Sequence, residues 1–111
     1  MIVEQRIYTL QPGGTSEYFR LYEEHGLEVQ TRILGNLFGC YQTECGVLNQ
    51  VVFLWAYDDL ADRARRRTAL LGDAPFGEFR KKSRHLVQRQ ENCLLLPAPF
   101  MHRLAATKSS A

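Results

Sequence analysis

Three residues with chemically useful side chains alternate along the first ten positions of the chain. They are Glu4, Arg6 and Tyr8. Residues two apart in an extended strand project from the same face, so this spacing predicts a surface that combines a carboxylate, a guanidinium and a phenol. There, Arg6 would orient a carboxylate or an enolate, and Glu4 or Tyr8 would transfer a proton. We take the three as candidate catalytic residues. A structural interpretation also stays open, in which Glu4 and Arg6 only pair with each other or across a subunit interface.

A β-hairpin is the second source of candidates. The stretch from Asn36 to Tyr57 has two arms rich in aromatic and β-branched residues, with Gly46 between them. The second arm is apolar on both faces from Val51 onward, which predicts a strand in the centre of a sheet. The candidate ligand-binding residues are Asn49, Phe53, Trp55 and Tyr57 on this arm, with Glu44 and Glu91 as residues that could join the site or pair at its rim.

The remaining elements are expected on both sides of this hairpin. Composition, caps and breakers predict a strand over residues 2–10, a helix from Thr15 or Ser16 that ends by Gly35, a helix capped by Asp58 or Asp59 that ends at Gly72, a helix from Asp73, and a strand over residues 86–96. Gly26 is a point at which the first helix is expected to bend or break.

The helix after Tyr57 contains a run of arginines at positions 63, 65, 66 and 67. We interpret this run as a solvated helix face rather than as a phosphate site, with Arg66 paired to Asp62 four residues earlier. The apolar face expected to pack inward is formed by Ala61, Ala64, Thr68 and Leu71.

Composition limits the class of protein. The chain has 111 residues, of which 45% are hydrophobic and 23% are charged, and its formal charge is +2. These values indicate one domain over residues 1–100, followed by a polar tail over residues 101–111. We expect no nucleic-acid partner, no membrane span and no signal peptide, and hence a cytoplasmic protein. No motif indicates a metal or a cofactor. The three cysteines, Cys40, Cys45 and Cys93, are expected to be reduced and buried.

The order strand, helix, strand, strand, helix, strand predicts a ferredoxin-like α+β fold with a four-stranded antiparallel sheet. Both helices would then cover one face. We assign Tyr8, Phe53, Trp55 and Tyr57 to the other face, which would be too aromatic to remain in water. A second copy of the chain is expected to cover it, which gives a homodimer with the candidate site between the two sheets.

The sequence also resembles the NIPSNAP family, within the dimeric α+β-barrel superfamily. The resemblance extends from Met1 to about Phe100, and its most specific parts are the Glu-x-Arg-x-Tyr strand and the Gly-x-x-Asn…Trp-x-Tyr strand. It is carried by Met1–Leu10, Leu34–Gly39, Thr43–Tyr57, Asp62-Arg63, Arg66-Arg67 and Pro97–Phe100. It implies the barrel fold and a dimer. Related barrels include cofactor-independent monooxygenases, cyclases and haem enzymes, so the fold alone assigns no reaction.

Two classes of function follow. The first is a small dimeric barrel that binds or converts an aromatic or polyketide-like molecule without a tightly bound cofactor. The second is a non-catalytic interaction protein whose inner sheet face only makes the homodimer. A cavity lined by the candidate residues favours the first class.

Overall fold

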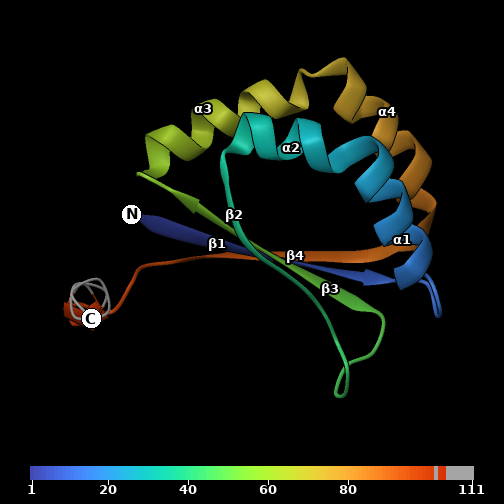
Figure 1. Cartoon of the computed structure of the whole chain (residues 1–111), viewed down its shortest axis with the longest axis horizontal. Coiled ribbons are helices and arrows are strands. Elements are labelled where there is room, and N and C mark those ends of the chain that lie inside the picture. Colours follow the sequence, from blue (N-terminus) through green and yellow to red (C-terminus); the bar gives the residue numbers. More distant parts are fainter. Residues whose placement is uncertain (102, 105–111) are drawn as a thin grey trace.

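The computed structural model describes residues 1–101 and 103–104, and shows a four-stranded antiparallel sheet with its helices on one face (Figure 1). The elements are β1 (Ile2–Leu10), α1 (Thr15–Leu21), the π-helix η1 (Tyr22–Gly26), α2 (Leu27–Leu34), β2 (Asn36–Gln42), β3 (Gln50–Tyr57), α3 (Leu60–Leu71), α4 (Ala74–Ser83), the 3₁₀-helix η2 (Arg84–Leu86) and β4 (Val87–Leu95). The strand order β2-β3-β1-β4 places β3 and β1 in the centre. The expected ferredoxin-like α+β fold is confirmed. The expected tail, residues 101–111, lies outside the described residues except for 101, 103 and 104.

The first helical segment runs through α1, η1 and α2. The π-helix ends at Gly26, the residue expected to disturb this helix. A Cβ atom on Gly26 would lie 2.9 Å from Cδ1 of Tyr22 and 3.1 Å from Cγ of Phe79. Glycine at this position therefore lets α4 pack closely against the first segment. Within the described part of the chain, no helix is long and apolar enough to cross a membrane.

Side-chain caps set the starts of the two later helices. Asp59 accepts a hydrogen bond from the backbone N–H of Asp62 at 2.7 Å at the start of α3. Asp73 accepts one from the N–H of Phe76 at 2.9 Å at the start of α4, which carries Pro75 in its first turn. Each cap satisfies a backbone donor that has no partner within its helix, so both starts agree with the sequence signals.

The helices cover the aromatic face of the sheet, and our assignment of this face as bare is wrong. The register pairs Glu4 with Trp55 and Arg6 with Phe53, so these residues share one face. Phe53, Trp55 and Tyr57 are only 2%, 0% and 3% exposed in the single chain. They pack in one cluster with helical residues that include Tyr18, Tyr22, Leu34 and Phe79. The aromatic stripes of the helices and the sheet bury each other, which removes the most apolar area from water.

The uncovered face carries the other set of alternating side chains. They are Val3, Gln5, Ile7 and Thr9 from β1 and Gln50, Val52, Leu54 and Ala56 from β3. Most of them are half-buried by their neighbours in the sheet, and in Figure 1 the helices α1 to α4 lie on the opposite side. Of the two faces of the sheet, this is the one that the helices leave open to a second copy, and we call it the uncovered face.

The connection between β2 and β3 is longer than expected, because β2 ends at Gln42. Cys45 and Asn49 therefore lie in the connection rather than in strands. Asn49 has φ of 63°, and its Oδ1 accepts a hydrogen bond from the N–H of Gly13 at 3.0 Å. All three cysteines are free, as expected, but each is exposed. Burial was wrongly expected because Cys40 and Cys93 lie on the two edge strands, where the helices give little cover.

Candidate functional site

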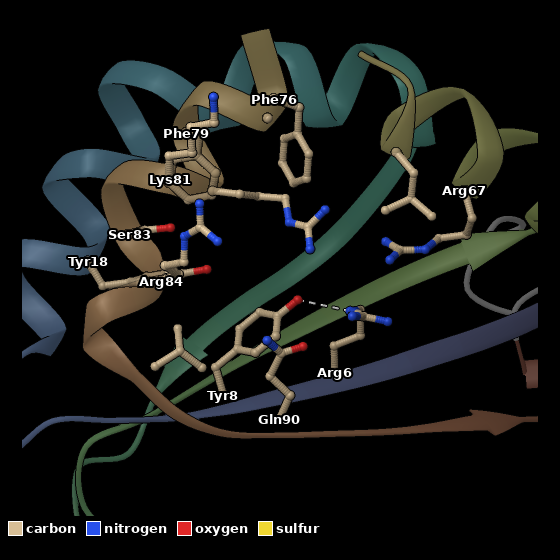
Figure 2. A pocket seen from close by; sticks show the side chains of 14 residues that line it. Arg6, Tyr8, Tyr18, Arg67, Phe76, Phe79, Lys81, Ser83, Arg84 and Gln90 are labelled. Carbon is tan, nitrogen blue, oxygen red and sulfur yellow. Dashed lines mark hydrogen bonds between the residues drawn. The ribbon is translucent and has the colours of Figure 1, made fainter. Parts of the chain in front are cut away.

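A pocket of about 420 Å³ opens between the sheet and the helical layer of one chain (Figure 2). Arg6 and Tyr8 of β1 line the sheet side, and Arg67 of α3 lines one end. The other walls come mainly from α4 and the residues after it: Phe76, Phe79, Arg80, Lys81, Ser83 and Arg84. The volume lies within the range of small-molecule sites. Arg6 and Tyr8 were expected in a cavity between two sheets, but they line this pocket on the face that the helices of the same chain cover.

Glu4 lies beside the pocket and is completely buried. Its carboxylate accepts hydrogen bonds from Arg63 Nη2 at 2.8 Å, Arg63 Nε at 3.2 Å, Arg6 Nη1 at 3.0 Å and Asn92 Nδ2 at 2.9 Å. These donors come from α3, β1 and β4, so one carboxylate joins a helix to two strands. A buried charge is tolerated when it is paired and hydrogen-bonded in this way. Glu4 is therefore an anchor of the site, and it does not itself line the pocket.

The pKa of Glu4 shows the strength of this network. Burial by itself would raise that pKa, because it disfavours the charged form. The hydrogen bonds from Arg63 and Asn92 and the charges of Arg6 and Arg63 outweigh burial and lower the pKa of Glu4 to about 2. The carboxylate stays ionised at neutral pH and is a poor candidate for a general base.

We expect this network to make the protein sensitive to acid. The pKa falls from 4.5 to about 2 on folding, so the stabilisation is present above pH 4.5 and is lost as the pH falls toward 2. The shift corresponds to about 3 kcal/mol, of which about 2 kcal/mol is lost by pH 3. Urea unfolding at pH 7 and pH 3 should show a larger loss for the wild type than for Glu4→Gln. An identical loss in the two proteins would contradict this assignment.

Arg6 is held in a fixed orientation by its two neighbours on the strand. Its Nη1 donates to Glu4, and its Nε donates to the Tyr8 hydroxyl at 2.9 Å. Burial opposes its charge, but Tyr8 and Glu4 together raise the pKa of Arg6. Two consequences follow for a ligand. Nη2 of Arg6 makes no hydrogen bond within the described residues, and the Tyr8 O–H remains available to donate because its oxygen serves as the acceptor for Arg6.

Arg67 extends into the same end of the pocket from α3, and Figure 2 shows its side chain directed toward the region of Arg6. Within the described part of the chain, no hydrogen bond or ion pair joins its guanidinium to another group. Burial and the charge of Arg6 lower the pKa of Arg67. The group still stays protonated, since arginine titrates far above neutral pH. A half-buried guanidinium that makes no direct ion pair within the described residues, next to a second guanidinium, is an arrangement that an anion would stabilise.

The whole pocket is positively charged. Its lining contains Arg6, Arg67, Arg80, Lys81 and Arg84, and among the described residues that line it there is no aspartate or glutamate. Aromatic rings of Tyr8, Tyr18, Phe76 and Phe79 form much of the remaining wall. The arrangement suits a flat molecule that carries negative charge.

The arginine run on α3 is the main feature that sequence reasoning misjudged. The predicted pair between Arg66 and Asp62 is confirmed at 2.9 Å. Arg63 and Arg67, however, face the sheet, whereas Ala61, Ala64 and Thr68 are exposed. Alanine and threonine bury little apolar area, and the buried Glu4 carboxylate provides a partner for Arg63. The sequence feature that could have predicted this orientation is the spacing of Arg63, Arg67 and Leu70, which places the three residues on one side of a helix.

Three of the candidate ligand-binding residues lie below the helices. Phe53, Trp55 and Tyr57 share the face of Arg6 and Tyr8, but they do not line the pocket. Trp55 Nε1 and the Tyr57 hydroxyl are buried and have no hydrogen-bond partner among the described residues. Burial and the nearby Glu4 charge raise the pKa of Tyr57 to about 12, so its phenol is neutral at physiological pH.

The other three candidates are not brought to the pocket. Glu44 and Asn49 lie in the connection between β2 and β3. Glu91 is exposed on the uncovered face, where Arg89 Nη2 lies 2.9 Å from its Oε1. Among the described residues, no group of three or more His, Cys, Asp and Glu side chains is placed so that it could hold a metal ion.

Comparisons with known proteins show which family has this architecture. The NIPSNAP family model matches residues 3–102. A NIPSNAP-like domain protein from Burkholderia xenovorans is 46% identical, with a TM-score of 0.86 over 89% of this chain and 86% of its own. A NIPSNAP family protein of unknown function from Agrobacterium tumefaciens is 38% identical, with a TM-score of 0.87 over 90% of each chain. A putative antibiotic biosynthesis monooxygenase from Nitrosomonas europaea shares the fold, with 16% identity and a TM-score of 0.65 over 87% of this chain and 98% of its own. No curated protein matches the chain. The chain belongs to the NIPSNAP family.

Proposed function

We propose that this protein binds a small aromatic anion in the pocket between its sheet and its helices. The observation that carries this proposal is the guanidinium of Arg67, which has no partner within the described residues and lies beside Arg6 in a pocket that no carboxylate lines. Glu4 accepts its hydrogen bonds from Arg6, Arg63 and Asn92, and its single negative charge is shared among three nearby guanidinium groups. A carboxylate or enolate of the ligand would supply the missing charge.

The same geometry suits a proton transfer to the bound anion. The Tyr8 hydroxyl is fixed by the Arg6 Nε–H, and its own proton is free for a ligand oxygen. If an enolate or phenolate lay against Arg6 and Arg67, Tyr8 would hold the proton next to the developing charge. Conversion of such a ligand, without a tightly bound cofactor, is the enzymatic form of this proposal.

The charge preference of the pocket can be measured with naphthoate and its neutral analogue naphthamide. Isothermal titration calorimetry should show naphthoate binding about tenfold more tightly or better, because a charge-assisted hydrogen bond to arginine is stronger than a neutral one. Arg67→Met should remove this preference, since it deletes the unpaired charge and keeps most of the side-chain volume.

The matched control is Arg65→Met, which removes the same charge from an exposed position on the same helix. Arg65 contacts Asp62 at 3.5 Å and does not line the pocket. This variant should bind naphthoate like the wild type. Equal affinity of the wild type for naphthoate and naphthamide, or an unchanged preference in Arg67→Met, would refute the proposal.

We also propose that two copies associate through the uncovered face. This face is rich in apolar side chains, and its charged pair, Arg89 and Glu91, leaves it without net charge, so it can meet its own copy without repulsion. An apolar groove of about 710 Å³ lies next to it, lined in part by Val3, Ala56, Leu95 and Leu96. The homodimer thus stays our preferred assembly, with a different face from the one that the sequence suggested.

A further inference from the structure

We infer that the ligand of this pocket is a dianion, an elongated molecule with an acidic group at each end and a flat apolar middle. This inference rests on the proposed function and goes further, because it names the class of ligand. The first acidic group would lie against Arg6, Arg67 and Tyr8. The second would lie against Ser83 and Arg84.

The second end has its own hydroxyl donor, on Ser83. Ser83 is a polar residue that lines the pocket and is only 4% exposed. Within the described residues, its hydroxyl makes no hydrogen bond to another side chain or to the backbone. In the part of the chain that the structure describes, the fully buried side-chain groups without a partner are Trp55 Nε1 and the Tyr57 hydroxyl, so the Ser83 hydroxyl is still accessible from the pocket. A ligand oxygen in the pocket could accept its proton.

The side chains around Ser83 provide the charge for an anion. Arg80 and Arg84 line the pocket, and neither forms an ion pair within the described part of the chain. Lys81 lines it too, although it contacts Glu78 at 3.3 Å. The carboxyl end of α4 adds partial negative charge at this position, and the three cations outweigh it. This end of the pocket therefore also favours a negatively charged group.

The two ends are separate binding points. In Figure 2, Arg6 and Arg67 lie at one end of the pocket, and Ser83, Lys81 and Arg84 lie at the other. A single small anion at Arg67 would leave Ser83 unpaired. A ligand with two acidic groups would satisfy both ends.

The surface between the ends is aromatic. Tyr8 and Phe76 lie between the two charged ends in Figure 2, on opposite sides of the pocket. The ring centroids of Phe76 and Phe79 are 5.6 Å apart, and those of Tyr8 and Tyr18 are 6.1 Å apart. Such walls favour a planar ring system over a flexible chain. Aromatic dicarboxylates have this combination of a flat middle and two acidic ends.

Matched aromatic mono- and dicarboxylates test the inference. The pairs are benzoate and terephthalate, naphthoate and naphthalenedicarboxylate, and biphenylcarboxylate and biphenyldicarboxylate, which differ in length. Calorimetric titration at constant ionic strength should show at least one dicarboxylate binding about tenfold more tightly than its monocarboxylate. Arg84→Gln should abolish this advantage, and Ser83→Ala should reduce it several-fold without changing monocarboxylate affinity.

Lys82→Gln is the control, because Lys82 belongs to α4 and is exposed but does not line the pocket. The advantage should persist in this variant. If every dicarboxylate binds within about twofold of its monocarboxylate while naphthoate binding still depends on Arg67, the dianion inference is wrong and the proposed function stands. If Lys82→Gln weakens the preference for the dicarboxylate as much as Arg84→Gln does, the preference reflects the overall charge of the protein, and the inference is also wrong. If no binding depends on Arg67, both are wrong.

Discussion

Replacing Glu4 with alanine is expected to lower the free energy of unfolding by about 3–5 kcal/mol, because a broken buried ion pair leaves an uncompensated charge. Arg6 and Arg63 would both lose their carboxylate, and Asn92 would lose its acceptor. The change would also detach α3 from β1 and β4 at this point. Urea unfolding at pH 7 measures the effect directly.

Glu91→Ala is the matched control, since Glu91 also pairs with an arginine but lies exposed on β4. Its cost should be below about 1 kcal/mol, as for other surface ion pairs. Similar costs for Glu4→Ala and Glu91→Ala would contradict the anchoring role of Glu4.

The hydrogen bonds of Glu4 also change the expected stability of a double replacement. Arg6→Met with Glu4→Gln still leaves Arg63 charged beside the site, so it is not expected to be neutral for stability.

Leu54→Glu is expected to convert the proposed dimer into a monomer. Leu54 belongs to central strand β3 and pairs with Gln5, in the middle of the uncovered face. A carboxylate there would have to be buried without a partner in a symmetric interface, and it would face its own copy. The dimer dissociation constant should rise on the order of 100-fold or more. Sedimentation velocity across a concentration series measures it.

Leu60→Glu controls for the added charge, because Leu60 is 62% exposed at the start of α3 on the helical side. This variant should stay dimeric. Trp55→Asp does not test the interface, since Trp55 is completely buried in the single chain and its replacement would unfold the subunit. A wild type that sediments as a monomer, or a Leu54→Glu protein that remains dimeric, would show that the uncovered face is not the interface.

The sequence by itself determined the order of the elements, the central position of β3 and the shared face of Glu4, Arg6 and Tyr8. These features follow from local rules: strands alternate with a period of two, capping residues begin helices, and apolar runs indicate central strands. The register of β1 with β3 then follows the expected pattern. The family resemblance rested on the same residues and is confirmed over residues 3–102.

Only the tertiary structure decided which face of the sheet the helices cover and where the pocket lies. Alternation shows that two sets of side chains point in opposite directions, but it does not show which set meets the helices. That choice depends on the total area that strands and helices bury together. Here Tyr22 of η1 packs on Phe53, and Tyr18 of α1 and Phe79 of α4 pack on Tyr22. The same packing turns Arg63 and Arg67 toward the sheet. Arg63 meets the buried Glu4, and Arg67 makes no hydrogen bond or ion pair within the described part of the chain.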